Sequence, residues 1–139
     1  MDKNDDRRRQ LIRDVLAATE AQGHDDVLAR AMPAWERLAA HLSPLVGEAG
    51  FCALYLRALR LSAPDEHWHN AIPGTRSVQT LLAALRDSLG AIDAQDAKLA
   101  NATLLDTFTK LLSGLIGEGL TTRLLNTAWT DRSEGKHNE

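Results

Sequence analysis

Two segments with nearly the same sequence, SPLVGEAG at residues 43–50 and SGLIGEGL at residues 113–120, lie 70 residues apart in this chain. Without gaps, this offset aligns Leu42 with Leu112, Ser43 with Ser113, Gly47 with Gly117 and Glu48 with Glu118. A repeated segment in a short chain has two interpretations, and both stay open. One is an internal duplication into two three-helix halves, 7–62 and 77–129. The other is chance similarity between leucine-rich helices.

The composition around these segments favours an all-α fold. A length of 139 residues predicts a single domain over 1–139, and 44% apolar residues can supply a core. Only 4% of the residues are aromatic, so Leu and Ala must supply most of that core, and both are strong helix formers. We therefore expect an all-α, single-domain bundle of about six helices, with residues 1–5 and 131–139 disordered.

Local signals place the helix boundaries. Pro33 removes a backbone donor, so we expect one helix to end and another to begin there. Ser43, followed by a proline, has the pattern of an N-cap, and Ser77 and Asp93 are the N-caps expected for later helices. Residues 93–129 are long enough for one helix or for two joined near Ser113-Gly114.

The helices expected at 44–62 and 115–129 are apolar on nearly every side, which predicts that they form the centre of the bundle. Glycines in both segments favour close packing between these two helices. The expected contact pairs Gly47 or Gly50 with Gly117 or Gly119.

Glu48 and Glu118 are the charged residues within the two similar segments, 43–50 and 113–120. A glutamate near a helix start interacts favourably with the helix dipole, whereas a buried one needs a cation or hydrogen-bond donors. We expect a structural role, with backbone N–H groups, a hydroxyl, Arg57 or Arg123 as the partner. A ligand or catalytic role is the alternative.

Residues 63–76, APDEHWHNAIPGTR, contain two prolines and no helical pattern, which predicts a loop. His67, Trp68 and His69 in this loop are the weak candidates for contact with a ligand or partner, with the tryptophan as the anchor. An HxH spacing alone lacks the distributed ligands of a closed metal site, so we expect no metal.

Other functional classes lack a matching pattern. The net charge is −3, and the one dense basic run, Arg7 to Arg9, follows two aspartates, so we interpret it as a solvated helical turn and expect no nucleic-acid partner. The segment RRRQLIRDVLAATEAQG resembles the first helix of TetR-type repressors, but no helix-turn-helix follows, because Met32-Pro33 falls where it would have to continue. The resemblance is therefore confined to this segment, and we do not expect a TetR-type DNA-binding function.

No phosphate-binding, nucleophile-elbow or CxxC pattern occurs, so we expect no catalytic residues and no cofactor. The sequence contains no uncharged apolar run of about 18 residues, so it predicts no membrane span. The single cysteine, Cys52, lies among apolar residues and is expected to be a buried, inert thiol in a cytoplasmic protein.

The sequence thus favours a non-enzymatic regulatory or protein-interaction domain, with a protein partner or self-association. The second hypothesis is a small-molecule sensor or carrier with a pocket between the two halves, where helical bundles place ligands. An enzyme without a recognisable motif is the third.

Overall fold

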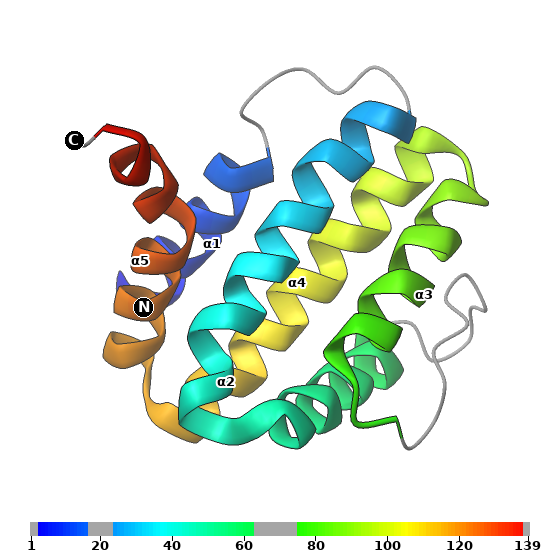
Figure 1. Cartoon of the computed structure of the whole chain (residues 1–139). Helices are drawn as coiled ribbons and strands as arrows, with labels where there is room; N and C mark the ends of the chain where they lie inside the picture. The colour runs from blue at the N-terminus through cyan, green and yellow to red at the C-terminus, as the bar shows by residue number, and fades with distance from the viewer. Residues whose placement is uncertain (1–2, 17–23, 63–74, 138–139) are drawn as a thin grey trace.

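The computed structural model describes residues 3–16, 24–62 and 75–137, and all regular secondary structure in these ranges is helical (Figure 1). The helices are α1 (Lys3–Leu16), α2 (His24–Ser62), α3 (Val78–Gly90), α4 (Ala94–Ile116) and α5 (Glu118–His137). The prediction of an all-α bundle is confirmed. Its described part has five helices rather than about six. Helix also extends into both segments expected to be disordered, 1–5 and 131–139, because α1 begins at Lys3 and α5 continues to His137.

Each of the two similar segments forms a corner in the chain. Gly47 has φ 83° and ψ 159° and divides α2 into two helical segments, 24–46 and 48–62. Gly117 has φ 97° and ψ 149° and separates α4 from α5. This region of backbone conformation is open almost only to glycine, because a side chain would clash with the backbone.

The prediction that these glycines allow close helix packing is therefore wrong. A Cβ atom added at Gly47, Gly117 or Gly119 would meet no atom within 4 Å, and one added at Gly50 would meet only Val46 of its own helix. The glycines at the two corners are needed for their backbone conformation. They do not allow the close approach of a second helix.

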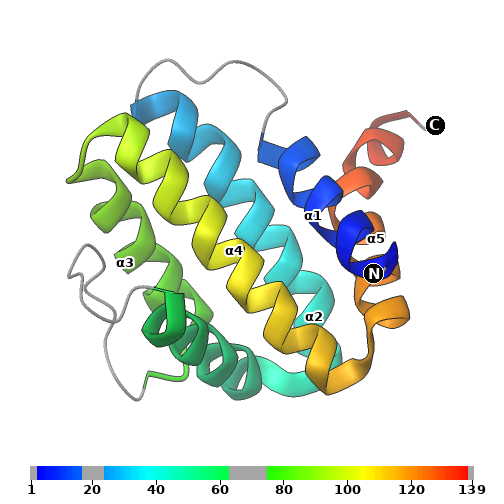
Figure 2. The same cartoon turned by 180° about the vertical axis from the view of Figure 1, so that it is seen from behind.

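The centre of the bundle is the pair formed by the first segment of α2 and α4, which lie side by side and run in the same direction (Figures 1 and 2). The expectation that helices 44–62 and 115–129 form the centre is thus wrong. Aromatic side chains are few but concentrated here: the rings of Trp35 and Phe108 lie 5.3 Å apart, centre to centre. The indole N–H of Trp35 donates a hydrogen bond of 2.8 Å to Oδ1 of the buried Asn101.

The remaining helices cover the two flanks of this central pair. On one flank, α1 packs against α4 and α5; on the other, α3 packs against α2 (Figure 2). Trp129 of α5 donates a hydrogen bond of 3.0 Å to the backbone oxygen of Ala34 in α2, which fixes α5 against the centre.

Two of the expected helix starts are confirmed. The Ser77 hydroxyl accepts a hydrogen bond from the N–H of Thr80, and the Asp93 carboxylate accepts one from that of Gln95. The predictions at Pro33 and Ser43 are wrong, because α2 continues through both positions until Gly47. Burial of one face of this long segment outweighs the loss of single hydrogen bonds at the prolines.

Candidate functional site

Both corners lie side by side at the same end of the molecule (Figures 1 and 2). Leu45 is 56% exposed, Leu115 is 64% exposed and Leu120 is 45% exposed. We name these three leucines and the exposed Pro44 the corner surface. Large exposed apolar side chains that gather at one place are typical of interaction sites in proteins.

The two corner glutamates, Glu48 and Glu118, are exposed beside this surface. Neither is therefore a buried carboxylate, which was one of the possibilities that the apolar sequence around them allowed. The backbone N–H of Val78 donates a hydrogen bond of 2.9 Å to Oε2 of Glu48. Glu48 lies at the start of its own helical segment, 48–62, as one alternative expected, and its hydrogen bond also stabilises the start of α3. Arg57 and Arg123 are both exposed.

Cys52 lies one turn after the Gly47 corner and is buried, as its apolar neighbours predict. Burial raises the pKa of its thiol above the ordinary value, and the negative charge of Glu48 raises this pKa further. The thiol is therefore protonated at neutral pH, which makes it a poor nucleophile and a poor metal ligand.

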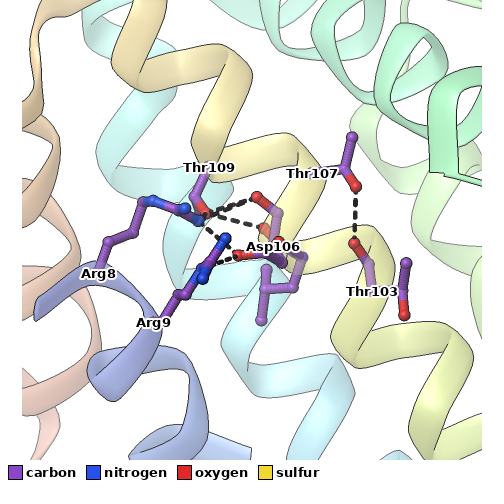
Figure 3. A network of polar contacts seen from close by, with 7 residues as sticks. Arg8, Arg9, Thr103, Asp106, Thr107 and Thr109 are labelled. Atoms are coloured by element: carbon purple, nitrogen blue, oxygen red, sulfur yellow. Dashed lines mark hydrogen bonds and ion pairs between the residues drawn. The ribbon is translucent and has the colours of Figure 1, made fainter. Parts of the chain in front are cut away.

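A partly buried polar cluster connects α1 with α4 (Figure 3). Nη1 of Arg8 donates hydrogen bonds to Oδ1 of Asp106 at 2.8 Å, to the backbone oxygen of Asp106 at 3.0 Å and to the Thr109 hydroxyl at 2.8 Å. Arg9 lies at the edge of the cluster, with its Nε 3.6 Å from the same carboxylate oxygen. Arg8 is only 2% exposed, so the interpretation of this basic run as a solvated turn is wrong for Arg8.

A groove of about 580 Å³ lies between α2 and α3 and is open to solvent. Its walls combine an apolar floor with polar side chains. The polar residues are Glu36, Ser43 and Glu48 of α2 and Gln79 and Arg86 of α3. The apolar ones include Met32, Ala39, Val78 and Leu82.

The weak candidates His67, Trp68 and His69 lie outside the described residues. Within the ranges that are described, no three His, Cys, Asp or Glu side chains come together in a group that could hold a metal ion. Nor does any helix there have the length and apolar character needed to cross a bilayer. Comparison of the chain with protein-family models, with curated proteins and with solved structures finds no match.

Proposed function

We propose that the chain consists of two three-helix halves related by an approximate two-fold axis. The first half is α1 with the two segments of α2, and the second is α3, α4 and α5. Support comes from the offset of 70 residues in the sequence: α2 and α4 begin at His24 and Ala94, and Gly47 and Gly117 follow the first segment of α2 and the end of α4. Both glycines have a positive φ and an extended ψ.

Burial at matching positions also supports the duplication. Apolar side chains are buried at both members of several pairs with the same offset: Leu11 and Leu81, Leu38 and Phe108, Leu42 and Leu112, Tyr55 and Leu125, and Ala58 and Ala128. The contacts between helices correspond as well, since α1 packs against α5 on one flank and α3 packs against α2 on the other. In this proposal the repeated segment specifies the same corner twice.

The function that this geometry supports best is a non-enzymatic interaction module, and we propose that the corner surface binds the same surface of a second copy. The observation that carries the proposal is the exposure of Leu45, Leu115 and Leu120 at one end of the molecule. In a closed, two-fold dimer of this kind, the corner surface of each copy is covered by that of the other, so both are removed from water.

The expected dimer is weak. Full burial of a leucine side chain contributes roughly 1.5–3 kcal/mol, so covering half-exposed leucines contributes about 1 kcal/mol each. Six such side chains in a dimer gain about 6 kcal/mol, which is comparable with the lower estimates of the entropy lost on association. We therefore expect a reversible dimer that depends on protein concentration.

Charge should modulate this association. Glu48 and Glu118 are exposed next to the leucines, so the same negative charges face one another across the proposed dimer. Salt screens such repulsion over about 10 Å at 0.1 M. Association should therefore strengthen as sodium chloride is raised from low concentration.

Sedimentation velocity across a range of protein concentrations tests the proposal. The Leu45→Ser/Leu115→Ser variant should remain a monomer where the unmodified chain forms dimers. Leu99→Ser is the matched control, because Leu99 is 68% exposed but lies in the first half of α4, away from the corners. A chain that remains monomeric at all concentrations, or a control variant that loses association equally, contradicts the proposal.

A further inference from the structure

The two repeated segments, 43–50 and 113–120, differ in which positions carry a bulky side chain. They share an exposed leucine at one position, Leu45 in the first segment and Leu115 in the second. At two other positions, a bulky residue in one segment corresponds, with the offset of 70, to a glycine in the other. These pairs are Pro44 with Gly114 and Leu120 with Gly50. Each segment therefore has a protruding residue where the other has a gap, and a gap where the other has a protruding residue.

Neither gap is filled by another part of the described chain. An added Cβ atom would meet no atom within 4 Å at Gly114, and at Gly50 it would meet only Val46 of its own helix. The two bulky residues point into solvent, since Pro44 is exposed and Leu120 is 45% exposed. Each gap is therefore open to a side chain from another molecule.

The position of the corners allows two arrangements of a two-fold dimer. The first segment of α2 and α4 run in the same direction, so a two-fold axis that relates them is parallel to both and leaves the molecule between the corners (Figures 1 and 2). A second copy, related by an axis perpendicular to this one, places each corner either on the same corner or on the other corner of its neighbour. We call these the like-to-like and the crossed arrangement.

Packing distinguishes the two arrangements. In the like-to-like arrangement, Leu120 meets Leu120 of the second copy, while Gly50 meets Gly50 and leaves a void between the copies. In the crossed arrangement, Leu120 of each copy meets Gly50 of the other, and Pro44 meets Gly114. The crossed arrangement therefore closes both sides of the contact equally, and a void forfeits the dispersion contacts of the atoms that line it.

Charge distinguishes them only after a substitution. Glu48 and Glu118 occupy the same position in the two segments. Glutamate faces glutamate in either arrangement, so the unmodified chain has the same repulsion in both. In the crossed arrangement, however, Glu48 of one copy faces Glu118 of the other, so a reversed charge at one of the two positions turns repulsion into attraction.

We propose that the dimer through the corner surface is crossed, with segment 43–50 of each copy on segment 113–120 of the other, and that Leu120 and Gly50 determine this arrangement. The inference deepens the proposed function and rests on the proposed dimer and duplication. It assigns the specificity of the contact to positions at which the two segments differ. The residues that they share form the corners themselves.

Charge reversal at Glu118 tests the arrangement by sedimentation velocity at low salt. In the crossed dimer, Glu118→Lys creates two attractive pairs with Glu48, so the dissociation constant should fall about 5-fold. Glu118→Gln is the control, because it only removes repulsion and should give a smaller fall. In the like-to-like dimer, lysine would face lysine, so Glu118→Lys would associate no more tightly than Glu118→Gln.

Gly50→Leu provides a second test that does not depend on charge. Gly50 lies inside the helical segment 48–62 and has no positive φ, so its backbone accepts a leucine, and circular dichroism checks that the variant is folded. In the crossed dimer, the new side chain meets Leu120 of the second copy, which should weaken association about 10-fold. Added Leu120→Ala should recover part of this loss. In the like-to-like dimer, the new leucines would fill the void and strengthen association.

Two results would overturn the crossed arrangement and leave the corner dimer intact. One is a dissociation constant of Glu118→Lys that equals or exceeds that of Glu118→Gln at low salt. The other is tighter association of folded Gly50→Leu than of the unmodified chain. An unmodified chain that stays monomeric at every concentration overturns the corner dimer itself, and the crossed arrangement with it, so the two failures are distinguishable.

Discussion

Replacement of the two corner glycines by alanine should destabilise the protein through the backbone alone. Gly47 and Gly117 have φ values of 83° and 97° with ψ near 150–160°, a conformation that costs other residues about 1–3 kcal/mol. Because an added Cβ atom would meet no atom within 4 Å at either site, no steric cost from neighbouring helices is added. Gly47→Ala and Gly117→Ala should therefore each lower the free energy of unfolding by about 1–3 kcal/mol, and the two losses should be similar.

Two further variants isolate the cause. Gly114 lies inside α4, also has open space around an added Cβ atom and has no positive φ, so Gly114→Ala should be neutral or stabilising by up to about 1 kcal/mol. Asn tolerates the left-handed helical region near ψ of 30–60°, but the corner ψ values lie far outside it. Gly47→Asn should therefore be no better than Gly47→Ala.

Urea unfolding followed by far-ultraviolet circular dichroism measures these costs. The free energy of unfolding falls by about 1–3 kcal/mol per molar urea, so a loss of 2 kcal/mol lowers the midpoint by about 1 M at a slope of 2. If the midpoints of Gly47→Ala and Gly117→Ala match that of Gly114→Ala, the glycines do not hold a restricted backbone conformation. A large cost at one corner only would contradict the equivalence of the two corners.

Three further predictions concern buried polar groups. Arg8→Met should cost about 2–4 kcal/mol in urea unfolding, because it removes a buried cation from Asp106, whose own side chain remains partly exposed. Asn101→Ala should cost about 2–3 kcal/mol in the same assay, because it leaves the buried indole N–H of Trp35 without its acceptor. Stability should fall as pH rises above about 8.5, because the raised pKa of Cys52 means that the unfolded chain releases the thiol proton first, and Cys52→Ala should flatten this slope between pH 8 and 10.

The fold class and the later helix starts could be predicted because they depend on local chemistry. Leucine and alanine content favoured helices, and Ser77 and Asp93 have side chains that accept hydrogen bonds at a helix start. The prediction of a helix boundary at Pro33 was wrong, because the apolar face that carries Trp35 and Leu38 stabilises the helix through tertiary contacts. Such contacts are not visible in a local pattern.

The repeated segments in the sequence marked the positions of the two corners, but the role predicted for their glycines was wrong. A glycine in an apolar segment is compatible with close packing and with a positive φ, and the sequence around Gly47 and Gly117 does not separate the two. Their shared position before a glutamate was the signal for a helix boundary. For Arg8, the signal was its spacing of three, four and seven residues from Leu11, Ile12 and Val15, which places it on the apolar face of α1.

The groove could not be predicted, because it depends on how α2 and α3 pack against each other in the folded chain. No pattern within residues 78–86 indicates an open site, since Val78 is an ordinary helix residue.

Hydrogen–deuterium exchange at low and high protein concentration tests the proposed interaction module most directly, because it locates the contact surface without any substitution. The account predicts that exchange slows with concentration in peptides covering residues 43–50 and 113–120, and that it does not change around Leu99. Slowing that is confined to other parts of the chain, or exchange that is independent of concentration at both corners, would contradict it.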